Sequence, residues 1–162
     1  MSIREDILDV LCKDARTAPE MIADLIGSDP KTVAEEIADM EKEGVIRRYK
    51  TIIDKEKVGD ERVFAFIDVR VSPTRGVGFD DVAKRIYRYP EVHSVYLVSG
   101  DYDLRVVVEG QIMREVAFFV ADKLATLEGV LSTQSNFLLK KYKEDGDIFD
   151  DEKEDTGRLL IS

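Results

Sequence analysis

The segment SGDYD at residues 99–103 carries the side chains best suited to binding a small charged molecule. Gly100 can adopt a positive φ, which lets the backbone come close to a ligand. Asp101 and Asp103 offer carboxylates to an ammonium group, and the free backbone N–H groups of such a turn suit a carboxylate. Together with Tyr102, this one turn could therefore hold both ends of a free amino acid.

Two hydroxyl residues, Thr133 and Ser135, are spaced for one face of a strand predicted near the end of the chain. We predict that they add contacts to the ligand held by the turn. The alternative is that residues 99–103 form only a hairpin turn, because Gly, Asp and Ser are common turn residues.

A second group of residues is suited to binding DNA. Lys31 and Thr32 stand at the start of a predicted helix, the end with which a recognition helix reads bases. Arg47, Arg48 and Lys50 follow the same helix, where basic side chains could neutralise phosphates. An ordinary solvated strand edge would explain this basic group equally well.

Three carboxylates on the same helix oppose DNA binding. Glu35, Glu36 and Asp39 would face phosphates of the same charge, and proteins gain affinity for DNA mainly by neutralising phosphates. Alternatively, these acids form a solvated helix face that pairs with Lys31 and Lys42.

Three short helices must position the DNA-binding group. The apolar spacing predicts helices over residues 3–13 and from Pro19 to Gly27, and Ser28 or Asp29 can cap a third helix that Gly44 ends. The β-branched segment VIRRYKTIID then predicts a strand. This order predicts a winged helix-turn-helix over residues 1–50. The residues expected to face its core are Ile3, Ile7, Leu8, Leu11, Cys12, Met21, Ile22, Leu25, Ile26, Val33, Ile37 and Met40.

The hydrophobic period changes after a polar linker at residues 51–62. Alternating and helical patterns then follow in the order β-α-β-β-α-β, which is the ferredoxin-like split motif. The fold class is therefore α+β, with a ferredoxin-like domain over residues 63–142. Residues 143–162 are acidic and lack a sustained period, so we expect a mobile tail. After the first strand at 63–71, the patterns cover residues 79–90 (helix), 92–110 (two strands joined through Gly100), 112–127 (helix) and 130–142 (strand).

The composition excludes several other functions. A formal net charge of −10 opposes nonspecific phosphate binding but allows a local basic patch. No apolar run approaches the ~18 residues that span a bilayer, and the charged N-terminus is unlike a secretion signal, so we expect a cytoplasmic protein. The single Cys12 and the single His93 offer no nucleophile–base pair and no metal site. We therefore predict no enzyme activity, no cofactor and no metal.

Three segments resemble the Lrp/AsnC (feast/famine) transcriptional regulators over roughly residues 3–143. They are PEVHSVYLVSGDYDLRVVV, LEGVLSTQSNFLLKKYK and KTVAEEIADMEKEGVIRRYKTIID. The third keeps the family's landmarks at Val33, Ile37, Glu41, Gly44 and Ile46, but related regulators usually carry Arg or Lys near Glu35, Glu36 and Asp39. The resemblance implies DNA binding through the first domain and a pocket, formed where dimers meet, for amino acids or related small molecules.

Two functions stay open on this evidence. The chain is a sequence-specific DNA-binding regulator that senses a small metabolite, or a sensor or protein-binding adaptor whose helix-turn-helix does not bind DNA. In either case we expect a homodimer that assembles to an octamer. The strand at 92–98 is apolar on both faces, so the face of the sheet without helices needs a partner.

Overall fold

The computed structural model describes residues 1–73 and 78–150. The chain divides into two compact units, Met1–Ile53 and Asp54–Ser162, and each is described by itself. This division falls within residues 51–62, the expected linker, while the domain ranges themselves remain predictions. Within the described residues, no helix is long and apolar enough to cross a membrane.

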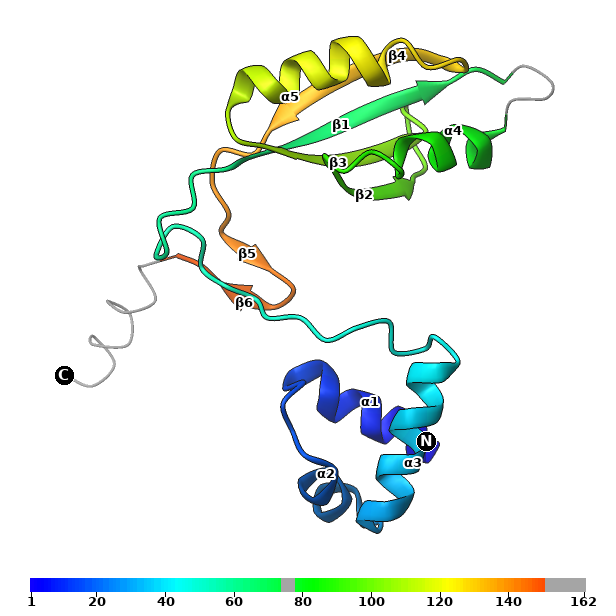
Figure 1. The fold of residues 1–162 in the computed structure, drawn as a ribbon, viewed down its shortest axis with the longest axis vertical. Coiled ribbons are helices and arrows are strands. Elements are labelled where there is room, and N and C mark those ends of the chain that lie inside the picture. Colours follow the sequence, from blue (N-terminus) through cyan, green and yellow to red (C-terminus); the bar gives the residue numbers. More distant parts are fainter. Residues whose placement is uncertain (74–77, 151–162) are drawn as a thin grey trace. The chain divides into compact units, whose positions relative to one another are not determined.

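The first unit consists of three helices, α1 (Ile3–Lys13), α2 (Pro19–Ile26) and α3 (Pro30–Lys42) (Figure 1). Local capping sets their ends. Gly27 closes α2 in a left-handed conformation with φ 71°. Asp29 then caps α3, where its side chain accepts hydrogen bonds from the backbone N–H groups of Lys31 and Thr32. The predicted helix-turn-helix is confirmed.

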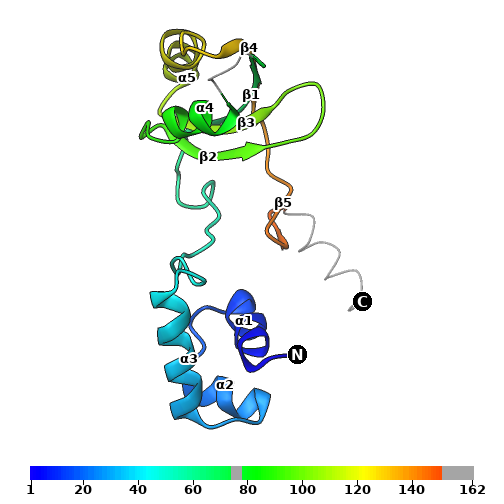
Figure 2. The ribbon, with the colours of Figure 1, turned by 90° about the vertical axis from the view of Figure 1, so that its right-hand side faces the viewer.

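The core of this unit differs from the prediction on α2. Met21 and Leu25 are 56% and 64% exposed, because α2 turns Ile22 and Ala23 fully inward instead. Cys12, predicted to be buried, is also exposed. Figure 2 shows α3 as a straight rod beside which α1 and α2 lie. The buried residues are Ile7, Ile22, Ala23, Val33 and Met40, with Ile3, Leu8, Leu11, Ile26, Ile37 and Ile46 packed against them.

The predicted wing strand does not form. Residues 45–53 have no regular secondary structure, and the first unit contains no strand with which they could pair. An isolated strand leaves its backbone groups without partners, so the β-branched content alone does not produce one. The observed fold is therefore a helix-turn-helix followed by an irregular segment.

The second unit is a four-stranded antiparallel sheet with helices on one face, as predicted. The strands are β1 (Val63–Val71), β2 (Val92–Leu97), β3 (Leu104–Gly110) and β4 (Val130–Phe137), in the spatial order β2-β3-β1-β4. The helices are α4 (Phe79–Ile86) and α5 (Met113–Phe119), and α5 continues as a single π-helical turn, η1 (Val120–Leu124). The βαββαβ order and the strand order are those of a ferredoxin-like fold.

Alternation along β1 sorts its residues between the two faces of the sheet. Ile67 and Val69 are fully buried beneath the helices. Phe66, Asp68 and Arg70 point to the other side, which we call the open face. The helix-covered core also contains Ala65, Val71, Val82, Ile86, Leu104, Val106, Val108, Val116, Phe119, Val120 and Leu124. Ile112, the first residue of the helical pattern expected over residues 112–127, is 53% exposed, since α5 begins only after it.

Residues 143–148, expected to be part of a mobile tail, form a hairpin. Its strands are β5 (Lys143–Glu144) and β6 (Asp147–Ile148). Asp145 and Gly146 have φ of 50° and 88°, the left-handed values that a two-residue hairpin turn requires. The Asp-Gly pair therefore explains the hairpin. Residues 151–162 of the expected tail lie outside the described residues.

Candidate DNA-binding surface and effector site

Lys31 and Thr32 lie together in the first turn of α3, as predicted from the sequence. The Lys31 side chain is 84% exposed. The backbone N–H and the hydroxyl of Thr32 both donate to the Asp29 carboxylate, and these bonds lower the pKa of Asp29. Thr32 therefore helps to cap the helix, and Lys31 is the freer of the two side chains.

Of the three acids Glu35, Glu36 and Asp39 on α3, the first two lie close to cations. Arg4 of α1 donates through Nε to Glu36 at 2.6 Å and through Nη1 to Glu43 at 2.7 Å. Hydrogen bonding with both acids raises the pKa of Arg4 and lowers that of Glu43. Glu35 instead lies 4.0 Å from Lys31, one turn away. Glu36 is turned toward α1 and paired with Arg4. The three acids should therefore repel phosphates less than the sequence predicts.

The basic residues after α3 are held in place by their neighbours. Ile46 packs on the core, and the Tyr49 hydroxyl donates to Glu41 at 3.3 Å. Partial burial and the Glu41 carboxylate raise the pKa of this tyrosine. Arg47, Arg48 and Lys50 flank these two anchors, and all three are exposed.

The predicted effector turn is braced from within by Asp103. Its backbone N–H donates to the Val69 carbonyl at 3.0 Å, and its Oδ2 accepts from the Val71 N–H at 2.8 Å. Its carbonyl accepts from the Val98 N–H at 2.9 Å, which closes the turn. Gly100 takes a φ of 133°, which disfavours any side chain there. Asp103 is thus fully engaged in holding the turn against the end of β1.

Asp101 contrasts with Asp103. Its side chain is exposed, and its carboxylate has no hydrogen bond or ion pair with the residues that the structure describes. Its carbonyl accepts two hydrogen bonds, from Nε and Nη2 of Arg70 at 3.2 and 3.0 Å. The turn therefore presents a carboxylate beside a guanidinium group.

Two residues missed by the sequence reasoning, Arg70 and Gln134, complete this cluster. The Arg70 guanidinium lies 5.1 Å from the centre of the Tyr102 ring, and the Tyr102 hydroxyl donates to Gln134 at 2.9 Å. The alternation of β1 already placed Arg70 on the open face. Its proximity to the turn could not be deduced, since 31 positions separate it from Asp101.

Thr133 and Ser135 are not brought to this cluster. They pair with Val69 and Ile67, whose side chains lie beneath the helices, so both hydroxyl residues belong to the helix-covered face. The β4 side chain that reaches the turn is Gln134, one position away.

The centre of the open face is polar, which corrects the expectation of an apolar one. Asp68 is only 8% exposed and accepts hydrogen bonds from Arg105 at 3.0 Å and Asn136 at 3.2 Å. Hydrogen bonding to Asp68 raises the pKa of Arg105. On β2, an irregularity between Val92 and Ser94 shifts the alternation, so Val92 joins the core. Apolar side chains border this polar centre, namely Phe64, Phe66, Tyr96 and Val107.

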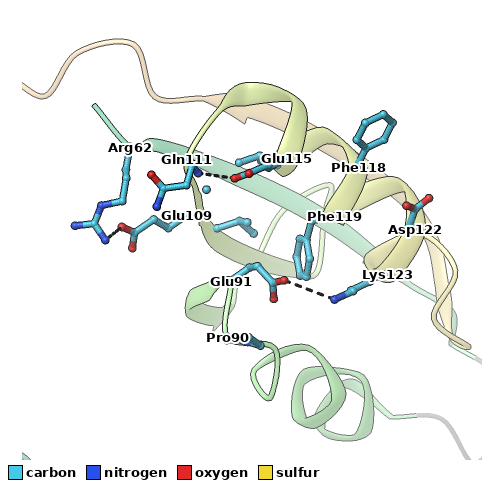
Figure 3. A pocket seen from close by; sticks show the side chains of 13 residues that line it. Arg62, Pro90, Glu91, Glu109, Gln111, Glu115, Phe118, Phe119, Asp122 and Lys123 are labelled. Atoms are coloured by element: carbon cyan, nitrogen blue, oxygen red, sulfur yellow. Dashed lines mark hydrogen bonds and ion pairs between the residues drawn. The ribbon is translucent and has the colours of Figure 1, made fainter. Parts of the chain in front are cut away.

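A cavity of about 640 Å³ lies at the other end of β3, next to α5 and η1 (Figure 3). Two of the carboxylates that line it are paired with cations of the same unit. Glu109 is 2.6 Å from Arg62, and Glu91 is 3.6 Å from Lys123. No group of three His, Cys, Asp or Glu in the described chain could hold a metal ion here or elsewhere.

Residues 64–148 match the family model of the Lrp/AsnC ligand binding domain. The uncharacterized HTH-type transcriptional regulator YugG of Bacillus subtilis (strain 168) is 51% identical over 158 residues, covering 97% of this chain and 95% of the relative. The chain belongs to the Lrp/AsnC family. Another relative, an HTH-type transcriptional regulator of Pyrococcus horikoshii, is 30% identical over 142 residues, with 88% of this chain and 91% of the relative covered.

Solved Lrp/AsnC structures share the fold. A transcriptional regulator from Neisseria meningitidis in complex with L-Met has a TM-score of 0.71 at 26% identity, covering 89% of this chain and 92% of that one. The leucine response regulatory protein LrpA of Mycobacterium tuberculosis has a TM-score of 0.75 at 23% identity, covering 91% and 97%. The family's ligand binding domain includes the turn at residues 98–103 and the β5–β6 hairpin. This Lrp/AsnC chain thus joins a helix-turn-helix unit to a ligand-binding unit.

Proposed function

We propose that this protein is a sequence-specific DNA-binding transcriptional regulator whose second unit senses an amino acid. The observation that carries the effector class is the unpaired Asp101 carboxylate on the turn whose Asp101 carbonyl binds the Arg70 guanidinium. A carboxylate and a guanidinium held at one turn suit the ammonium and the carboxylate of a free amino acid. The L-Met bound to the Neisseria relative supports the same class.

In the proposed pocket, Asp101 binds the ligand's ammonium group and Arg70 its carboxylate. Arg70 would exchange its bonds to the Asp101 carbonyl for bonds to the ligand. Gly100 allows close approach, and Tyr102 with Gln134 forms one wall. Asp103 holds the turn in place, and Thr133 and Ser135 are left out because they lie on the helix-covered face.

In the proposed DNA complex, the first turn of α3 enters the major groove with Lys31 and Thr32. Arg47, Arg48 and Lys50 then contact phosphates, a role that their exposure beside α3 allows. The proposed function requires no enzyme activity. The protein would act in the cytoplasm, where it binds DNA.

We further propose that the open face is covered by a second copy, with dimers assembling to an octamer. Its apolar border could pack against the same border of a partner, and Asp68, Arg105 and Asn136 satisfy one another in the polar centre.

The exposed Met21 and Leu25 favour the alternative function, a protein-binding adaptor, since an apolar pair on a surface helix suits a protein partner.

Binding of the full chain to its own upstream DNA at low and moderate salt tests the DNA half of this proposal. We expect binding that weakens as salt rises. Protein that shows no preference for this fragment over scrambled DNA would favour the adaptor.

Calorimetry across the twenty amino acids tests the sensing half. Asp122→Asn is the matched control for Asp101→Asn, because Asp122 lines the cavity at the far end of β3. Loss of binding in Asp101→Asn alone supports the turn, whereas loss in Asp122→Asn alone would move the ligand to the cavity.

A further inference from the structure

Between Lys31 and Ala38, α3 exposes small side chains together with one opposite-charge pair. Val33, Ile37 and Met40 pack inward. At about 100° per residue, the positions that face away from this stripe are 31, 35, 38, 39 and 42, and position 34 lies at their edge. All six positions are exposed. We call Lys31, Ala34, Glu35 and Ala38 the reading strip, and Asp39 and Lys42 follow it toward the end of the helix.

Glu35 is the carboxylate of the reading strip, and a second exposed carboxylate, Asp39, lies one turn further along α3. Glu36 lies on the flank nearest α1, where Arg4 binds it at 2.6 Å. The Glu35 side chain is 63% exposed, and its carboxylate is 4.0 Å from the Lys31 ammonium. The strip therefore presents one cation and one anion close together, beside two alanines that allow the helix to approach a surface closely.

This pair matches the major-groove edge of a G·C base pair. Guanine presents two acceptors, N7 and O6, and the paired cytosine presents the N4 amino donor beside them. Lysine donates to guanine, and a glutamate accepts from cytosine N4. Alanine makes apolar contact with the methyl group of thymine. In the middle of the groove, a carboxylate also lies away from the phosphates that would repel it.

We propose that Glu35 determines specificity by accepting a hydrogen bond from cytosine N4, while Lys31 binds guanine and Ala34 and Ala38 contact thymine methyl groups. The inference rests on the proposed DNA-binding function and adds the class of sequence recognised. Each half-site then contains a cytosine that cannot be exchanged without loss, next to thymine.

Selection from a randomised double-stranded DNA pool tests this assignment with the full chain. The variant is Glu35→Gln, because glutamine prefers adenine, whose N6 and N7 it can bind together. Asp9→Asn is the matched control, since Asp9 is an exposed carboxylate on α1 outside the strip. Circular dichroism checks that both variants remain folded.

We expect the wild type and Asp9→Asn to enrich the same motif with one cytosine per half-site. In Glu35→Gln, the enrichment of cytosine should fall by at least about tenfold and adenine should be enriched at the same position, with the rest of the motif unchanged. Glu35→Ala should lose the preference without gaining adenine.

An unchanged motif in Glu35→Gln and Glu35→Ala would overturn the assignment of Glu35 while leaving DNA binding intact. A wild type that enriches no motif would instead refute sequence-specific DNA binding itself, and with it the recognition of cytosine by Glu35.

Discussion

Alanine substitutions of Asp101 and Asp103, two positions apart, should separate the stability of the second unit from effector binding. Asp103 accepts the Val71 N–H at 2.8 Å, and Val71 is only 4% exposed. Asp103→Ala therefore leaves a buried N–H without its charged acceptor. Such a bond contributes about 1.5–3 kcal/mol, and we expect the free energy of unfolding to fall by that amount. Asp101 is exposed, and Asp101→Ala should change the free energy by less than about 0.5 kcal/mol.

Urea unfolding followed by far-ultraviolet circular dichroism measures this difference. All variants are compared at one protein concentration, because assembly would make the apparent stability depend on concentration. The slope against urea should stay constant while the midpoint falls in Asp103→Ala. The midpoint of Asp103→Asn should lie between those of the wild type and Asp103→Ala, since its amide oxygen can still accept the hydrogen bond from Val71 but carries no charge. Equal stability of Asp103→Ala and the wild type would refute the bracing role of Asp103.

Four further outcomes follow from the same structure. Asp101→Ala should weaken amino-acid binding by about 1.5–3 kcal/mol in calorimetry. If the variant binds as tightly as the wild type, the ligand binds somewhere other than this turn. Arg47→Ala with Arg48→Ala should weaken DNA binding on all sequences and reduce the slope of log affinity against log salt by about 1.8, whereas Arg114→Ala on α5 should not. Arg4 lowers the pKa of Glu43 below its ordinary 4.5, so this contribution to stability is present above pH 4.5 and is lost at lower pH. Wild type and Arg4→Ala should therefore differ in unfolding near neutral pH and converge below pH 4.5. Light scattering should find at least a dimer, and a monomer at micromolar concentration would refute the role of the open face.

Local signals were sufficient to predict the helices and most of the strands. Asp29, Pro30 and Gly44 fix the ends of α3 through bonds made within a few residues of each other. The alternation of β1 likewise follows from its own sequence, because its buried side chains all meet one core. Such features need no knowledge of distant segments.

Features that depend on register between strands could not be predicted in this way. The register of β1 with β4 sets Gln134 opposite Asp68 and Thr133 opposite Val69, which decides that Gln134 rather than Thr133 lies on the open face. The sequence of β4 has no clean apolar alternation from which its phase could be deduced. The contact between Arg70 and Asp101 depends on the same long-range packing, as does the turning of Glu36 toward Arg4.

Coupling between the two proposed sites tests the central claim most directly. Fluorescence anisotropy would measure the affinity of the full chain for its upstream DNA with and without the amino acid that binds in calorimetry. We predict that the amino acid changes the DNA affinity of the wild type by at least about fivefold, in either direction, and leaves that of Asp101→Ala unchanged. Wild-type DNA affinity that is the same with and without saturating amino acid would contradict the account.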